Sequence, residues 1–189
     1  MIGACTPLTA GALSDQVPVV EDLDPTAQLI VDGTLLERWS WKDRPELYSG
    51  RHRTTGLSVQ VACTLSGALA WVCDPHDGRV HDTEALRRCG LLEVPPQDLP
   101  DGAQPPLHVG DKGYTGLGMI TPRREPANLP LHPNDRTCNR AVNQIRYKTE
   151  RAIANIKTWR ILHTGYRRPP DTFPETITAI LGIIFTYTP

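Results

Sequence analysis

Three acidic residues, Asp32, Asp111 and Glu150, are the side chains of this sequence best suited to chemistry with metal ions. Hard divalent cations such as Mg²⁺ take oxygen ligands, mainly carboxylates and waters. Two such ions about 3.5 to 4 Å apart can hold the attacking and leaving oxygens of a phosphoryl transfer. Without a cation, clustered carboxylates would raise one another's pKa values. The sequence therefore predicts a site for Mg²⁺ or Mn²⁺.

Two strand ends are expected to position the aspartates. The apolar, β-branched run at positions 28–34 predicts a first strand that carries Asp32, and the run at 107–111 predicts a later strand that ends in Asp111. In α/β sheets, ligands and chemistry collect at such ends, because the loops there can vary while the strands hold position. A hairpin is predicted between them, at 56–63 and 68–73. Because the later strand must return by a crossover, we expect a mixed sheet in an α/β fold.

A long helix from Asn139 to Leu162 is expected to carry Glu150 beside its apolar stripe. Considered alone, Glu150 could instead form an ordinary surface ion pair with Arg146 or Arg151. A shorter helix is predicted from about position 82 to Cys89.

The two ends of the chain differ in their predicted structure. A last amphipathic helix, from Asp171 to Tyr187, is expected to pack on the sheet. Residues 1–27 lack periodicity and predict an irregular lead-in, whereas residues 28–189 form one domain of ordinary size.

The composition indicates a soluble globular protein. Hydrophobic residues make up 39% of the 189 residues and charged residues 22%. No apolar run approaches the roughly 20 residues of a membrane helix, and the N-terminus shows no signal-peptide pattern, so a cytoplasmic protein without a membrane partner is expected. Five scattered cysteines also suit a reducing compartment. A zinc site built from Cys73, His76 and His81 is disfavoured, because there is no CxxC pair and no evident fourth ligand.

The charge is distributed unevenly along the chain. Residues 136–168 contain nine Lys and Arg residues against the single acid Glu150, a formal charge of +8. Such density is expected for a protein that binds a polyanion, since Lys and Arg replace counterions on phosphates. The alternative is a solvated helix face without a partner.

Four segments together resemble a DDE transposase of the IS5 type, over roughly residues 28–185. They are Val31-Asp32-Gly33-Thr34, the stretch Tyr48 to Gln60, Gly110-Asp111-Lys112-Gly113-Tyr114, and the stretch Tyr147 to Leu162. The resemblance implies an RNase H-like fold, with a mixed five-stranded sheet flanked by helices. It assigns Asp32, Asp111 and Glu150 as catalytic ligands of two Mg²⁺ or Mn²⁺ ions.

The activity that the resemblance implies is hydrolysis at transposon ends, which frees a 3′ hydroxyl that attacks target DNA. The partners would be double-stranded DNA, as transposon ends and target, and further copies of the chain in an active homo-oligomer. His81 and Asp82 match a recurring pair and are possible accessory residues, with helix capping as the alternative. The residues expected to contact DNA are Lys112, Tyr114, Arg51, Arg53, Arg146, Lys157 and Arg160.

Transposases of this type usually carry a helix-turn-helix region before the first aspartate. The residues before Asp32 show no such pattern, so residues 1–27 are expected to be the remnant of a missing DNA-binding region. Two other functions remain open. One is an inactive or repurposed remnant that binds DNA or protein through its basic C-terminal helix. The other is an RNase H-like nuclease that acts on RNA or junctions.

Overall fold

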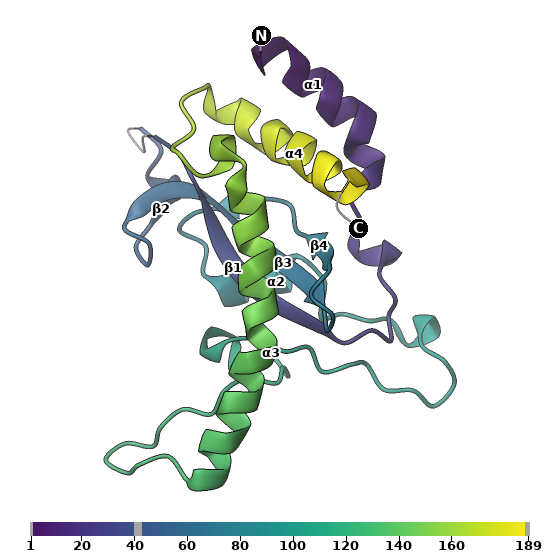
Figure 1. Ribbon diagram of the computed structural model, residues 1–189, viewed down its shortest axis with the longest axis vertical. Helices are drawn as coiled ribbons and strands as arrows, with labels where there is room; N and C mark the ends of the chain where they lie inside the picture. The colour runs from purple at the N-terminus through teal and green to yellow at the C-terminus, as the bar shows by residue number, and fades with distance from the viewer. Residues whose placement is uncertain (1, 40–42, 188–189) are drawn as a thin grey trace.

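The computed structural model describes residues 2–39 and 43–187. Its sheet contains β1 (Leu29–Glu37), β2 (Tyr48–Ser49), β3 (Thr54–Thr64), β4 (Leu69–Val72) and β5 (His76–Asp77). The helices are α1 (Ile2–Leu13), α2 (Asp82–Arg88), α3 (Pro133–Thr158) and α4 (Phe173–Tyr187) (Figure 1). The predicted α/β class, the five strands and the flanking helices are confirmed.

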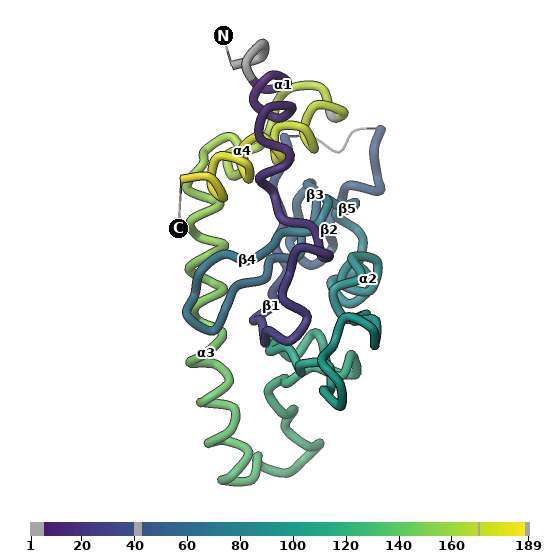
Figure 2. The backbone as a smooth tube through the Cα atoms, turned by 90° about the vertical axis from the view of Figure 1, so that its right-hand side faces the viewer, coloured from purple at the N-terminus to yellow at the C-terminus, as the bar shows by residue number. Residues whose placement is uncertain are grey.

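The central strand β3 pairs with every other strand of the sheet, and each of these pairs is antiparallel. All nine residues of β3 between its two end residues are buried, which requires cover on both faces. Helix α3 lies against one face and α2 against the other (Figure 2). The predicted first strand and hairpin are confirmed as β1, β3 and β4.

The expectation of a mixed sheet needs a correction, because the named strands are all antiparallel. The segment around Val109 does run parallel to β1, but only as an isolated bridge to Ile30. Two hydrogen bonds make this bridge, from Val31 N to Val109 O and from Val109 N to Leu29 O, both 2.8 Å long. Prolines at 105 and 106 and glycines at 110 and 113 limit a longer ladder at this edge.

Helix α3 begins six residues earlier than predicted and ends at Thr158. It is anchored by Thr149, which is fully buried and whose hydroxyl lies 3.1 Å from the Cys63 sulfur and donates to Ile30 O over 3.4 Å. The buried residues of α3 are Thr149, Ala152 and Ile156, all in its second half. The first half of the helix extends beyond the sheet (Figure 1).

The prediction of an irregular lead-in is wrong for residues 2–13, which form α1. This helix is apolar around its circumference, so its sequence lacks the period that marks an amphipathic helix. Pro7 also lies inside it, where proline normally disfavours a helix. Packing explains the result, because α1 and α4 lie side by side at one end of the molecule (Figure 1).

Helix α4 spans most of the predicted range, with a 3-10 turn at Pro170–Thr172 before it. It was expected to pack on the sheet, but its main partner is α1. Its apolar side chains Phe173, Ile177 and Ile184 still join the core cluster that includes sheet residues. None of the described helices combines the length and the apolar character that crossing a bilayer requires.

Candidate active site

Asp32 and Asp111 lie on two neighbouring, parallel chain segments. The bridge pairs Ile30 with Val109, and each aspartate follows its bridge residue by two positions. Residues in parallel register lie side by side, so the two carboxylates come to the same edge of the sheet. Both are partly exposed, with 17% and 22% of their side-chain surface accessible. The two aspartates thus lie near one another, but among the described residues the three acids Asp32, Asp111 and Glu150 do not form a group whose ligand atoms all lie within 4.8 Å of one another, so the three-acid set stays a prediction.

Each aspartate is oriented by the backbone that follows it. An oxygen of Asp32 accepts from the N–H of Gly33 over 2.9 Å. An oxygen of Asp111 accepts from the N–H of Gly113 over 2.7 Å and caps the 3-10 turn Lys112–Tyr114. These local contacts hold Oδ1 of each carboxylate, whereas Oδ2 of each faces an arginine.

Burial is the main cause that raises the pKa of Asp32 above its ordinary value, and the charge of Asp111 raises this pKa further. The positive charge of Arg146 opposes the effect, with smaller contributions from the Gly33 N–H and Arg51. A divalent cation between the two aspartates would relieve the same penalty. The carboxylate donors, their partial exposure and their mutual repulsion together fit a hard divalent ion.

Two arginines supply positive charge to the site. Arg146 of α3 donates to Asp32 Oδ2 over 3.4 Å, with 16% of its side chain exposed. Arg51, in the turn between β2 and β3, pairs with Asp82 and lies 3.9 Å from Asp111 Oδ2. Both were expected to contact DNA; in this structure they neutralise carboxylates.

Asp82 joins the site from the start of α2. An added Cβ at Gly33 would lie 2.5 Å from Asp82 Oδ1 and 3.0 Å from Gln60 Nε2, so a larger residue there would displace these two side chains. His81 is the N-cap of α2, with its side chain accepting from Thr83 N. The two possible accessory residues therefore have different places: His81 caps the helix, as the alternative held, whereas Asp82 lies against the aspartate site.

Tyr114 supports the site from inside the core. It is 1% exposed, and its hydroxyl donates to Gln60 Oε1 over 2.6 Å. Burial, with the charges of Asp32 and Asp111, raises the pKa of this phenol. The expected contact of Tyr114 with DNA is corrected, because a buried ring cannot reach a duplex; sequence reasoning missed Gln60, which is fully buried beside it.

Glu150 is exposed and lies one helical turn beyond Arg146, on the same face of α3. That face reaches Asp32 through Arg146. Within residues 2–39 and 43–187, no hydrogen bond or ion pair joins Glu150 to another side chain, so the surface ion pair considered from sequence is absent there. Its place as a third ligand stays a prediction.

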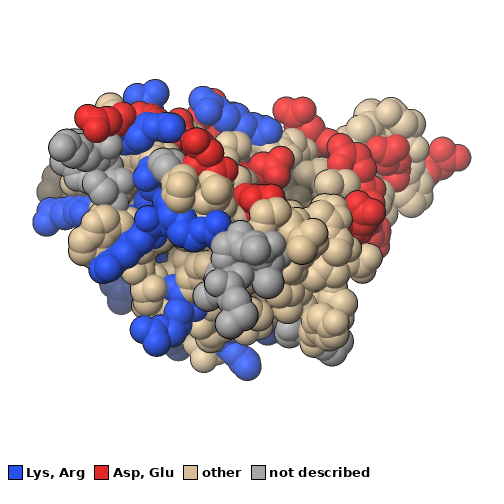
Figure 3. Space-filling model, turned by 90° about the horizontal axis from the view of Figure 1, so that it is seen from above, with Lys and Arg blue, Asp and Glu red and all other residues tan. Residues whose placement is uncertain are grey.

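The remaining basic residues expected to contact DNA differ in their exposure. Lys112, Arg53 and Arg160 are exposed, whereas Lys157 is half-buried. Burial lowers the pKa of Lys157, and the charge of Glu37 opposes that shift. On the face seen from above, Lys and Arg gather on one side with a few Asp and Glu among them, whereas the other side shows Asp and Glu alone (Figure 3).

The metal-free protein should lose stability as the pH rises through the titration of Asp32. Since the folded-state pKa is raised above the ordinary 3.8, the folded chain binds more protons than the unfolded chain between these two values. Asp32→Asn should not show this fall in the free energy of unfolding. The difference between the variant and the parent should therefore grow as the pH rises between the two pKa values and stay constant above them. Urea unfolding in chelator-treated buffer, from about pH 3 to pH 8, measures it. The exposed variant Asp101→Asn is the control, and a pH-independent difference for Asp32→Asn would contradict the prediction.

Two carboxylates on neighbouring parallel segments, both partly buried and each with an arginine nearby, thus form the candidate site. The family described as DDE superfamily endonuclease matches residues 31–184, and the chain belongs to this family. It is 26% identical over 153 residues to a protein from Microchaete diplosiphon named as a transposase for insertion sequence element IS702, covering 75% of this chain and 50% of that protein. It is 28% identical over 136 residues to one from Streptomyces albus G named as a transposase for insertion sequence element IS112, covering 71% and 49%.

The chain spans about half the length of the curated relatives it matches. No solved structure matches it significantly. The family prediction is confirmed, whereas the IS5 type and the RNase H-like fold stay predictions.

Proposed function

We propose that this chain is the catalytic domain of a transposase of the IS5 type, with an RNase H-like arrangement of its sheet and helices. It would cut DNA phosphodiester bonds at transposon ends and join the freed 3′ end to target DNA. The observation that carries this proposal is the parallel bridge between Ile30 and Val109, which brings Asp32 and Asp111 to one edge. The transposase names of the two relatives point the same way.

Asp32, Asp111 and Glu150 would hold two Mg²⁺ or Mn²⁺ ions. When bound, such ions activate the attacking oxygen and stabilise the leaving oxygen of a phosphoryl transfer. The three carboxylates would bind these ions and hold them in position. Arg51 and Arg146, already beside them, can turn to phosphate oxygens of the substrate. The hydrogen bond between Tyr114 and Gln60 holds the Gln60 side chain next to Gly33, the residue that follows Asp32.

Duplex DNA would lie along the exposed first half of α3. This half borders a shallow hollow of about 600 Å³, lined by groups that bind phosphate and sugar. They include Arg136, Arg140, Asn139, Asn143, Gln144 and Tyr147. Tyr147 is 59% exposed, so its ring is available to a partner. The active form would be a homo-oligomer, since two transposon ends must be cut together.

Metal binding tests the proposal directly. Millimolar Mg²⁺ or Mn²⁺ should raise the thermal unfolding midpoint, because a ligand of the folded state stabilises by about 2.7 kcal/mol at a hundred times its Kd. The rise should be lost in Asp32→Asn, Asp111→Asn and Glu150→Gln and kept in Asp101→Asn. Differential scanning fluorimetry measures it.

An equal rise in parent and acid variants would contradict the shared site. The second candidate is a repurposed remnant that binds DNA through its basic helix, which Arg136 and Arg140 at the hollow on α3 favour. It predicts salt-sensitive DNA binding in the parent with no metal-dependent rise at all.

A further inference from the structure

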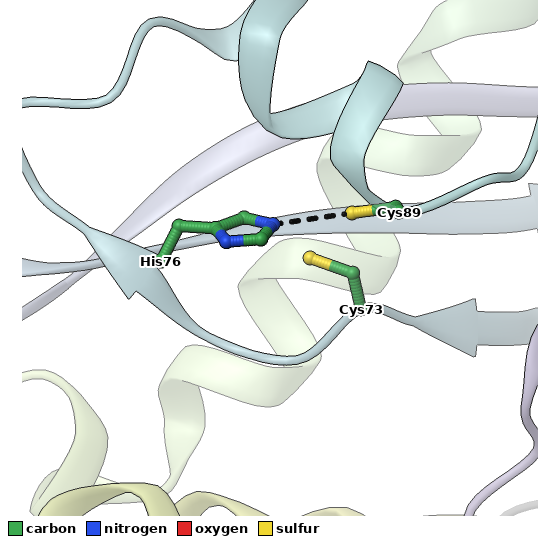
Figure 4. A group of neighbouring side chains, drawn as sticks. All are labelled: Cys73, His76 and Cys89. Carbon is green, nitrogen blue, oxygen red and sulfur yellow. Dashed lines mark hydrogen bonds between the residues drawn. The ribbon is translucent and has the colours of Figure 1, made fainter.

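Two cysteines and a histidine meet on the side of the sheet that α2 covers. Cys73 follows β4, His76 begins β5 and Cys89 is the C-cap of α2. Their three ligand atoms all lie within 4.8 Å of one another. His76 Nε2 is 3.4 Å from Cys89 Sγ, and the Cys73 sulfur points toward both (Figure 4). Sequence reasoning paired Cys73 and His76 with His81 and missed Cys89, which only the path of α2 brings near.

The spacing of these atoms matches three corners of a tetrahedral metal site. Zinc bonds of about 2.3 Å to sulfur and 2.0 to 2.1 Å to nitrogen imply ligand-to-ligand distances of roughly 3.4 to 3.8 Å. The observed distance of 3.4 Å between His76 and Cys89 lies in this range. The other two pairs are each at most 4.8 Å apart and would close toward the same spacing when a metal binds.

The backbone holds the three residues firmly. Cys73 N donates to Gln60 O, and Gln60 N donates to the Cys73 sulfur, both over 2.9 Å. His76 pairs with Ser58 on β3, and Cys89 N donates to Ala85 O at the end of α2. Two of the ligands are thus fixed to the central strand and the third to a helix that packs on it, which limits the entropy lost on binding.

We propose that Cys73, His76 and Cys89 bind one zinc ion, with water or the neighbouring Asp74 in the fourth position. Binding releases one proton from each thiol, and the neutral histidine ligates through the Nε2 lone pair. The fourth coordination position is open to solvent, because the cluster borders a cavity of about 680 Å³. No oxidant or reductant is needed.

The donor set distinguishes this site from the aspartate site. Thiolate and imidazole select zinc, whereas Mg²⁺ and Mn²⁺ prefer carboxylates and water. A disulfide between Cys73 and Cys89 would use the same sulfurs but would give His76 no role. The histidine nitrogen directed at Cys89 is what favours a metal over a disulfide.

Zinc would brace the helix that presents Asp82. Helix α2 has seven residues, of which only Ala85 and Leu86 are buried, and helices this short are marginal without tertiary support. Zinc would join its C-terminal end to the segment between β4 and β5. Its N-terminal end carries Asp82, which pairs with Arg51 and lies against Gly33. The metal would therefore stabilise the position of α2 and, through it, the position of Asp82 beside the aspartate site.

Metal content and cobalt spectroscopy test the proposal. Chain purified without chelators should contain about one zinc per molecule by mass spectrometry. After zinc removal, Co²⁺ should give thiolate-to-cobalt charge-transfer absorption and the intense visible bands of a tetrahedral site. Both signals should be lost in Cys73→Ser and Cys89→Ser and weakened in His76→Gln. Cys138→Ser, at an exposed cysteine of α3, and Asp32→Asn should keep them.

Three results would overturn the proposal. One is a parent chain that gives no thiolate-to-cobalt absorption, a readout that does not depend on the folding of any variant. Another is a cobalt spectrum that is unchanged in Cys89→Ser. The third is a parent mass lower by two hydrogen atoms, with Cys73 and Cys89 linked as a disulfide. Retention of zinc in Asp32→Asn separates this test from that of the metal ions held by the acids.

Discussion

Replacing Asp111 with asparagine should reduce metal-dependent DNA cleavage about a thousand-fold while the chain stays folded. A metal ligand supplies several kcal/mol of transition-state stabilisation, and each 1.4 kcal/mol changes a rate about tenfold. Folding should survive, because the substitution keeps the shape of the side chain and removes a negative charge near Asp32. Cleavage of a labelled duplex with Mn²⁺, together with circular dichroism, measures both effects.

The control for this prediction is Asp101→Asn, which changes the same residue type at an exposed turn. It should cleave like the parent, and both variants should bind duplex DNA. Cleavage by Asp111→Asn within tenfold of the parent would refute the catalytic assignment. An unfolded Asp111→Asn chain would instead show that folding requires the charge of this carboxylate, because asparagine keeps an acceptor for the Gly113 N–H.

Replacing Gly56 with alanine should destabilise the fold by about 3 kcal/mol, at the upper end of typical overpacking costs. An added Cβ would lie 2.3 Å from Leu36 O and 3.0 Å from the Leu36 carbonyl carbon. Both atoms belong to the backbone of β1, so no side-chain rotation can relieve the overlap. The pairing of β1 with β3 would have to open at this point. The midpoint of urea unfolding measures the loss.

Gly50→Ala is the matched control, since an added Cβ there meets nothing within 4 Å. It should unfold within about 0.5 kcal/mol of the parent, as surface substitutions usually do. Equal midpoints for the two variants would mean that β1 and β3 are less closely packed at Gly56 than the structure shows.

Local sequence patterns predicted the elements whose residues carry their own signal. β1 and the hairpin of β3 and β4 have β-branched runs and a glycine turn at Gly67. The prediction that strand ends position the two aspartates was wrong, because β1 continues past Asp32 to Glu37 and Asp111 follows an isolated bridge. The capping of α2 by His81 could also be predicted from the sequence, because a cap involves only residues close in the chain.

Features that depend on distant contacts were not predictable in this way. Helix α1 lacks an amphipathic period and forms against α4. The burial of Tyr114 depends on Gln60, a strand residue far away in the sequence. Cys89 reaches Cys73 only because α2 folds back along the sheet. In each case a tertiary contact overrides the local preference.

The unequal burial of α3 gives its two halves different local stabilities. Thr149, Ala152 and Ile156 tie the second half to the core, whereas the first half has no buried residue and is held by exposed polar contacts of Asp135 and Asn139 with Arg123. Such a segment opens at a lower free energy than the whole domain. The end of the helix that extends from the body can therefore fray or reorient around a duplex, while the turn that carries Glu150 stays anchored through Thr149.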